Sequence, residues 1–305
     1  MKNSRFFNQA ALLLRILPVI NNEQKFALKG GTAINFFVRD LPRLSVDIDL
    51  VYLPVEEREK SLNDISEAIV RIENRLSQII PGLRYQRKLN PVERTFYGLI
   101  VSSENAIVKI EPNTTLRGSV YPPEMLNLCS KAEDLFELSL KVRSLSSEEL
   151  YAGKVCAALD RQHPRDLFDI KLLLENEGIT DKLRKAFIVY LISHPRPIEE
   201  VLNPNMIDIR DIFAKEFKGM TSEDIKLEEL LEIRRKLVEI IRQSLTENEK
   251  SFLISFKNKL PEWNLLGLDG IDNMPAVKWK LENLNRMSPA KHKAALLKLE
   301  KYLTA

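Results

Sequence analysis

The sequence predicts an α+β protein in which a mixed sheet flanked by helices is followed by a mostly α-helical C-terminal domain. In the first half, short runs rich in β-branched and aromatic residues alternate with amphipathic helices. After about Ser147, apolar residues recur at helical spacing almost to the end of the chain. A length of 305 residues allows two ordinary domains, which we place at 1–147 and 148–305.

The N-terminal half begins with apolar residues at helical spacing, which predict a helix that ends near Pro18. A short apolar strand then leads into Gly30 and Gly31, and Thr32 is placed to cap a helix over 33–38. A strand at 44–53 and a long charged helix at 56–80 follow. Three further strands are expected at 83–89, 95–102 and 106–111.

The C-terminal half reads as a series of helices. Pro164 suits the first turn of one of them, because its missing N–H has no partner there in any case. The boundary between the halves lies somewhere within 120–147. The expected helices cover 148–160, 164–176, 180–193, 207–218, 226–246, 248–259, 276–286 and 289–303.

Composition excludes several classes of protein. Lys and Arg total 46 against 43 Asp and Glu, so the chain is neither an acidic disordered protein nor a polycation. Two cysteines cannot form a disulfide framework, and three scattered histidines do not form a zinc cluster. Asn8, Gln9 and Arg15 interrupt the apolar N-terminal stretch, and no run approaches the ~20 residues that a bilayer requires. We therefore expect a cytoplasmic protein without a membrane partner.

The most informative feature is a pair of acids in one strand. Asp47 and Asp49 alternate with Val46, Ile48 and Leu50, so the carboxylates share one face and the apolar side chains the other. Like charges this close repel unless a cation lies between them. Mg²⁺ prefers such oxygen ligands and keeps room for substrate phosphates, so Asp47 and Asp49 are predicted metal ligands.

A third carboxylate is expected from a neighbouring strand. Lys109 and Glu111 face away from Val108 and Ile110, so Glu111 can join the two aspartates if the strands pair. Three such carboxylates could hold two Mg²⁺ ions, one activating an attacking hydroxyl and one stabilising a leaving oxygen. Glu104 is an alternative acid nearby.

The segment Lys29-Gly30-Gly31-Thr32 predicts a phosphate-binding turn. It follows a strand and precedes a helix, and glycines let backbone amides approach a triphosphate at the helix N-terminus. Thr32 offers a hydroxyl at the same place. The spacing of a Walker P-loop is missing, so the turn is of another kind. Most Gly-Gly and Asp-x-Asp pairs carry no function alone; it is their combination that is informative.

These residues resemble a known family. The runs GGT at 30–32 and RLSVDIDL at 43–50 are similar to AbiEii/AbiGii-type toxin nucleotidyltransferases, a branch of the polymerase-beta-like superfamily. The segment ELYAGK at 149–154, with ALDR at 158–161 and PRDLFDI at 164–170, resembles the family's lysine and Arg-Asp-x-x-Asp motifs. A block at 275–284 resembles a late motif. The resemblance covers about 26–286 and implies the polymerase-beta-like fold for the sheet domain.

The resemblance also implies roles for the second motif. Lys154 would reach the β- or γ-phosphate and act in catalysis, and Asp169 would belong to the active cleft, so the helical domain would supply both. Arg165 and Asp166 would line or support the same cleft. Without the resemblance, the helix dipole would explain Asp166, and Arg165 and Asp169 could form an ordinary surface pair.

The implied function is that of a metal-dependent nucleotidyltransferase toxin of a bacterial toxin–antitoxin or abortive-infection system. It would transfer NMP from NTP to an acceptor hydroxyl, in relatives of this kind the tRNA 3′ end, and release pyrophosphate. Its antitoxin would be a separate protein, typically with a winged-helix part. Two Mg²⁺ ions and NTP are the expected cofactor and co-substrate.

Two other functions stay open. The acceptor could be a protein or small-molecule hydroxyl, or the chain could be a non-catalytic regulatory protein that kept the fold. A C-terminal excess of positive charge slightly favours RNA, although a solvated helix face explains it equally well. The excess consists of seven basic residues over 277–305, at positions 278, 280, 286, 291, 293, 298 and 301, against Glu282 and Glu300.

Overall fold

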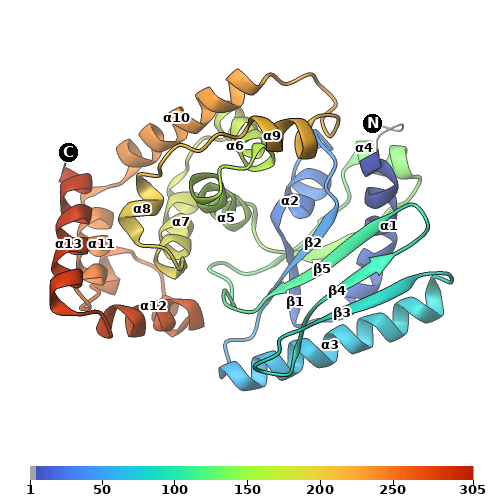
Figure 1. Ribbon diagram of the computed structural model, residues 1–305, viewed down its shortest axis with the longest axis horizontal. Helices are drawn as coiled ribbons and strands as arrows, with labels where there is room; N and C mark the ends of the chain where they lie inside the picture. Colours follow the sequence, from blue (N-terminus) through green and yellow to red (C-terminus); the bar gives the residue numbers. More distant parts are fainter. Residues whose placement is uncertain (1–4, 305) are drawn as a thin grey trace. The chain divides into compact units, whose positions relative to one another are not determined.

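The computed structural model describes residues 5–304 and divides the chain into two compact units (Figure 1). The first consists of Met1–Leu150 together with a later segment, Lys218–Asp224. The second consists of Tyr151–Phe217 and Ile225–Ala305. A short piece of the second half of the sequence therefore belongs to the sheet-bearing unit, which no periodicity in the sequence indicates.

The first unit is built on a seven-stranded mixed sheet in the order β3-β4-β5-β2-β1-β7-β6. Strand β2 runs parallel to β5, and β1 runs parallel to β7, while the other neighbours are antiparallel. The predicted fold class, a mixed sheet flanked by helices, is confirmed. The strands are β1 (Phe26–Lys29), β2 (Asp47–Tyr52), β3 (Arg84–Leu89), β4 (Phe96–Ser102), β5 (Ile107–Asn113), β6 (Glu124–Asn127) and β7 (Lys141–Ser144).

Helices α1 (Arg5–Asn21) and α3 (Arg58–Ile79) contact each other and cover one face of this sheet. In Figure 1, α3 runs along β3 and β4. Every second residue of the central strands packs toward these helices and is almost fully buried. These residues are Leu28, Ile48, Leu50, Leu99, Val101, Val108 and Ile110. Burial of such side chains contributes ~1.5–3 kcal/mol each, so this layer fixes the register of the strands.

Several elements differ from the sequence-based expectations. Helix α1 continues past Pro18 to Asn21, because Pro18 is solvent-exposed while the following Val19 and Ile20 are buried. The helix expected at 33–38 begins earlier, as α2 (Gly30–Ala33), and continues as a π-helical turn, η1 (Ile34–Val38). Thr32 is therefore inside the helix and does not cap it. The elements β6, α4 (Ser130–Phe136) and β7 occupy the stretch that the sequence left unassigned.

The second unit is helical, as expected. The predicted helix at 207–218 is a short α9 followed by a π-helical turn, and α8 was not anticipated. Helix α5 (Ser147–Asp160) begins in the first unit and ends in the second. The others are α6 (Pro164–Asn176), α7 (Asp181–Ser193), α8 (Ile198–Leu202), α9 (Arg210–Ile212), η2 (Phe213–Phe217), α10 (Leu227–Ser244), α11 (Glu247–Lys257), η3 (Trp263–Leu265), η4 (Ile271–Asn273), α12 (Pro275–Asn285) and α13 (Pro289–Thr304).

Within residues 5–304, none of the helices is both long enough and apolar enough to cross a bilayer.

Candidate active site

Asp47 and Asp49 lie on the face of β2 that points away from α1 and α3. Both are partly exposed, while Ile48 and Leu50 between and beside them are buried in the opposite layer. This is the arrangement that strand alternation predicts. Two carboxylates are thus presented together at the start of a central strand.

Glu111 lies directly across from Asp49 on the parallel strand β5. In the same register Lys109 lies across from Asp47, so acids and one cation share this face. The Glu111 carboxylate accepts a hydrogen bond from the ammonium of Lys88 on β3. The expected juxtaposition of Glu111 with the aspartates is thus present in the strand register.

Lys88 reaches Glu111 across the intervening strand β4, where its partner in the register is Gly98. A Cβ at Gly98 would lie 3.2 Å from Lys88 Cδ and 3.1 Å from the carbonyl oxygen of Ile110. A glycine inside a strand often marks such a close approach. Because Gly98 has no side chain, the Lys88 side chain can extend over β4 and reach the Glu111 carboxylate.

The glycine turn lies against the carboxylate pair. Gly30 has a φ of +71°, a conformation that L side chains rarely adopt, and it directly follows β1. A Cβ at Gly30 would collide with Asp49 Oδ2 and lie 3.1 Å from Asp49 Cγ. Glycine is therefore required at position 30 for two reasons: the backbone has a positive φ, and the Asp49 carboxylate occupies the space that a Cβ would need. Lys29, the residue before the turn, pairs with Asp49 in the antiparallel register.

Thr32 connects the turn to the aspartate strand. Its hydroxyl donates to the backbone carbonyl of Asp47 over 2.6 Å and lies 3.0 Å from Ser45 Oγ. The side chain is only 1% exposed. Thr32 therefore fixes the position of Asp47 relative to the turn, an arrangement that the sequence pattern alone does not predict.

Gly31 provides space for a buried arginine. A Cβ at Gly31 would lie 2.7 Å from Arg43 Nη2, and the Arg43 side chain is 2% exposed. Arg43 Nη1 donates to its neighbour's carbonyl, Leu44 O, at 2.9 Å. The guanidinium adds positive charge beside a turn that is predicted to hold phosphates. Sequence reasoning assigned no role to Arg43, although it stands at the start of the quoted motif.

The donor set fits a divalent cation bound through two carboxylates. Mg²⁺ is commonly held by one or two carboxylates together with substrate phosphates, and Asp47 and Asp49 supply that number. In the part of the chain that the structure describes, no group of three or more His, Cys, Asp or Glu side chains is arranged to hold a metal ion. The carboxylate of Glu111 is bonded to Lys88 instead. A role for Glu111 as third ligand thus stays a prediction.

Lys154, Asp166 and Asp169 form a second, buried cluster within the helical unit. Lys154 Nζ lies 2.9 Å from Asp166 Oδ1 and 3.0 Å from Asp169 Oδ2. The ammonium-bearing side chain is 6% exposed, and both carboxylates are fully buried. Arg161 adds two hydrogen bonds to Asp166, at 2.5 and 3.0 Å. The three predicted residues are thus brought together.

Lys154 and Arg161 stabilise the ionised form of the buried Asp166 carboxyl. Burial alone would raise the pKa of its carboxyl, but the Lys154 ammonium and the Arg161 guanidinium together hold that pKa well below its usual range. These two cations therefore favour the ionised form of the Asp166 carboxyl. An uncompensated charge would be costly at this depth, so the lysine and the aspartates depend on one another.

Arg165 and His163 take other places. Arg165 Nη2 lies 3.9 Å from Glu216 Oε2, so its side chain is directed toward η2. His163 caps α6: its Nδ1 accepts a hydrogen bond from the backbone N–H of Arg165 at 3.1 Å. The position expected for Pro164, in the first turn of this helix, is confirmed.

Lys88, Gly98 and Arg43 are the residues of this region that sequence reasoning missed. A glycine inside a strand otherwise rich in aromatic and aliphatic residues is the one signal that could have drawn attention to Gly98.

Comparison with known proteins shows similarity to a family model and to solved structures. A family model described as "Nucleotidyl transferase AbiEii toxin, Type IV TA system" matches residues 11–283. Among solved structures, the fold is similar to that of MenT4, a nucleotidyltransferase toxin from Mycobacterium tuberculosis H37Rv. That similarity has a TM-score of 0.57 at 15% sequence identity and covers 90% of this chain and 93% of the other. No curated protein matches the chain.

Proposed function

Since the chain belongs to the AbiEii nucleotidyltransferase toxin family of type IV toxin–antitoxin systems, we propose that its acceptor is RNA, and specifically the 3′ hydroxyl of tRNA. Family membership makes the chain a nucleotidyltransferase that uses NTP and has an antitoxin as partner. The acceptor, the use of Mg²⁺, the winged-helix part of the antitoxin and a cytoplasmic location are our proposals.

One observation supports the nucleotidyl-transfer site itself: Gly30 holds a turn directly against Asp49, on the strand that presents Asp49 and Asp47 together. A triphosphate on this turn would lie beside the two carboxylates. Asp47 and Asp49 would hold Mg²⁺, which when bound would neutralise charge on the phosphates. Lys29, Gly30, Gly31 and Thr32 remain the predicted NTP-binding turn, with Thr32 acting through the backbone of Asp47.

In the proposed reaction, the acceptor hydroxyl gives up its proton to water and its oxygen forms a bond to the α-phosphorus of NTP. The bond from that phosphorus to the bridging oxygen breaks, and pyrophosphate leaves with the electron pair. Such transfers depend mainly on positioning and on charge stabilisation. This chain contributes fixed carboxylates on β2 and the backbone of the turn, both held by the Thr32 hydrogen bond.

Lys154 and Asp169 remain proposed catalytic residues, and Arg165 and Asp166 remain proposed NTP-binding residues. The family resemblance supports these roles. Lys154 is paired with Asp166 and Asp169, so its role includes holding those buried carboxylates. Replacing Lys154 is therefore expected to lower stability as well as activity, and activity must be compared at matched folded fractions.

The test is incubation of the purified protein with Mg²⁺, each labelled NTP and total tRNA. We expect label at the RNA 3′ end in the wild type and at least a 100-fold loss in Asp49→Asn, which keeps the side-chain shape but removes the charge. Asp134→Asn, an exposed acid on α4, is the matched control and should keep full activity.

The acceptor and the catalytic role are tested separately by the same assay. Label on protein or on a small molecule, with none on RNA, would replace RNA as the acceptor. If overexpression arrests growth equally in the wild type and in Asp49→Asn, catalysis is not the cause of toxicity and the proposed mechanism is wrong.

A further inference from the structure

The sheet face that carries Asp47 and Asp49 continues across β5, β4 and β3 as an exposed surface. Helices α1 and α3 pack against the opposite face of these strands, where the alternate residues are buried. We call the exposed side the open face. It consists of Arg84, Gln86, Ile100, Ser102, Ile107 and Lys109, which the strand register places in adjoining rows beside the carboxylates.

The register fixes the order of these rows. Lys109 is the direct neighbour of Asp47 on β5. Ile100 on β4 faces Lys109, and Gln86 on β3 faces Ile100, so one row extends from Asp47 to the outer strand. Three interstrand spacings of ~4.8 Å make this row ~14 Å long. The next row contains Ile107, Ser102 and Arg84.

The open face is positively charged. Arg84 and Lys109 are both exposed, and neither side chain makes an ion pair or a hydrogen bond within residues 5–304. Lys88, on the next row, is the cation already bound to Glu111. A cation without a protein partner beside a nucleotidyl-transfer site is available to a phosphate group. Gln86 and Ser102 add neutral donors between the charges.

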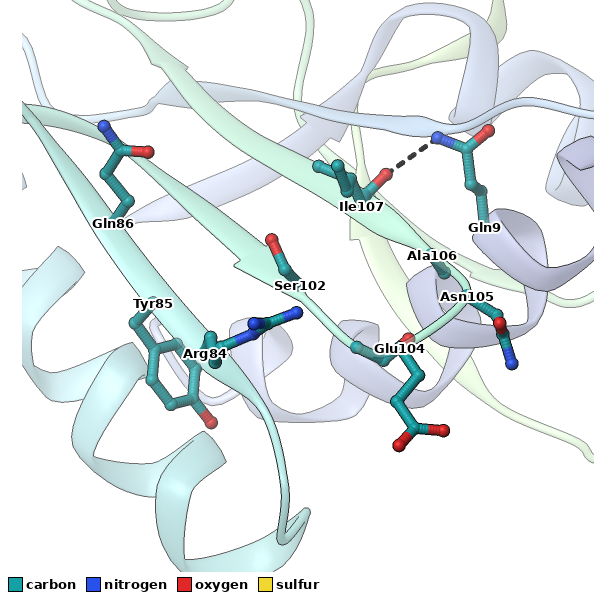
Figure 2. A pocket seen from close by; sticks show the side chains of 10 residues that line it. Gln9, Arg84, Tyr85, Gln86, Ser102, Glu104, Asn105, Ala106 and Ile107 are labelled. Carbon is teal, nitrogen blue, oxygen red and sulfur yellow. Dashed lines mark hydrogen bonds between the residues drawn. The ribbon is translucent and has the colours of Figure 1, made fainter.

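The outer end of the open face is hollowed. A cavity of about 640 Å³ lies there, lined among others by Arg84, Gln86, Ser102 and Ile107. Figure 2 shows Arg84 beside Ser102, with its guanidinium directed toward the β4–β5 turn. Gln9 of α1 closes one side through its hydrogen bond to the carbonyl of Ile107 at 2.9 Å. Glu104 on the turn is the one acid among the lining residues.

We propose that the open face binds the acceptor RNA: its 3′-terminal nucleotide lies beside Asp47, and the preceding sugar-phosphate backbone crosses β5 and β4 toward Arg84. The proposal rests on the proposed function, because it places the acceptor of that reaction. A surface of cations separated by neutral donors and by Ile100 and Ile107 suits a flexible, polyanionic strand. An acidic protein could also meet the two cations, but it would not require a continuous path that ends at the carboxylates.

The decisive variant is Arg84→Glu, because Arg84 is the cation of the open face that lies farthest from the carboxylates. Its matched control is Arg15→Glu, which makes the same change in net charge at an exposed arginine of α1 that has no ion pair with any residue of 5–304. Arg84→Lys tests retention of charge. Lys109→Gln, compared with Lys141→Gln on β7, tests the inner end. Thermal melting establishes that each variant is folded.

Binding is measured with a fluorescent single-stranded RNA that ends in a free 3′ hydroxyl, across a range of salt concentrations, and KM is measured with total tRNA. We expect Arg84→Glu to raise Kd and the KM for RNA about tenfold and to reduce the slope of log Kd against log salt by about one. The KM for NTP should stay unchanged. Arg84→Lys should retain most of the affinity, and Arg15→Glu should behave as wild type.

Two results would overturn the proposal. One is an unchanged RNA affinity in Arg84→Glu; the other is an equal loss in Arg84→Glu and Arg15→Glu, which would mean a general charge effect. Loss of neutralisation by the antitoxin with unchanged RNA binding would make the face a protein interface instead. RNA binding is measured without NTP, so it is independent of catalysis. If label never reaches RNA but Arg84→Glu still weakens RNA binding, only the proposed function fails.

Discussion

Asp166 illustrates how single residues of the helical unit depend on their partners. Its buried carboxylate is bonded to Lys154 and Arg161, which keep its pKa below the usual value. Breaking a buried ion pair typically costs ~3–5 kcal/mol because the remaining charge stays buried. We expect Asp166→Asn to lower the free energy of unfolding at pH 7 by about that amount, measured by urea denaturation. Asp211→Asn, an exposed acid, should change it by less than ~0.5 kcal/mol.

The same residue gives the protein a dependence on pH. A carboxyl whose pKa is lower in the folded state contributes stability above its unfolded pKa of ~3.9, and that contribution is lost as the pH falls further. Unfolding measured from pH 5 to pH 2.5 should therefore be steeper in the wild type than in Asp166→Asn. Equal slopes would mean that Asp166 is not the group that titrates.

At the residue scale, sequence reasoning found the aspartates and glycines because local spacing determines which face they occupy. Thr32 shows where such reasoning fails. Its hydroxyl bonds to Asp47, fifteen positions later, and no local pattern reveals that contact. The bonds of Lys154 to Asp166 and Asp169 likewise depend on how α5 and α6 pack, which no local pattern reveals.

At the scale of elements, Gly98 in β4 leaves the space through which the Lys88 side chain extends over the strand. Lys88 passes over this glycine to reach Glu111. Lys88→Met removes a positive charge beside Glu111 and Asp49, so we expect Mn²⁺ to bind about fivefold tighter in isothermal titration. Gly98→Ala should shift the affinity in the same direction, since its Cβ would press on Lys88.

The two variants check one another. Lys141→Met removes an exposed cation from β7 and should leave Mn²⁺ affinity unchanged. If Lys88→Met tightens Mn²⁺ binding while Gly98→Ala does not, Lys88 does not need the gap in β4, and the explanation for this glycine is wrong.

Elements with strong periodicity were predicted well, and those fixed by distant contacts were not. The long helix α3 and the strands β3, β4 and β5 lie within a few residues of their expected bounds. The expected end of α1 at Pro18 was wrong, because burial of Val19 and Ile20 outweighs the hydrogen bond that proline lacks. Short β6 and β7 form only because β7 pairs with β1, more than a hundred positions earlier.

At the scale of the whole molecule, Lys280 holds distant parts of the helical unit together. Its ammonium donates to the carbonyls of His194 and Arg196, both at 2.6 Å, and the side chain is 8% exposed. Unsatisfied buried acceptors cost ~1–3 kcal/mol each, so Lys280→Met should destabilise the protein by about 3 kcal/mol in urea. Lys278→Met, on the exposed side of the same helix, is the control. Equal stability of the two variants would contradict this role.

Lys280 lies in the block at 275–284 that resembles a late motif of the family. The sequence could show that this block is distinctive, but not that its lysine secures a loop more than eighty positions earlier. That link arises from tertiary packing, which one sequence does not reveal.

The segment Lys218–Asp224 belongs to the first unit, so a fragment of the chain that is meant to fold like this unit must include it. This segment supports the loop before the aspartate strand: Leu44 N–H donates to Met220 O at 2.9 Å, and Ser222 N–H donates to Pro42 O at 3.2 Å. A fragment truncated at residue 150 would lack that support, so β2, the strand that carries Asp47 and Asp49, would begin from an untethered loop. A fragment meant to carry the complete sheet unit must therefore combine residues 1–150 with residues 218–224.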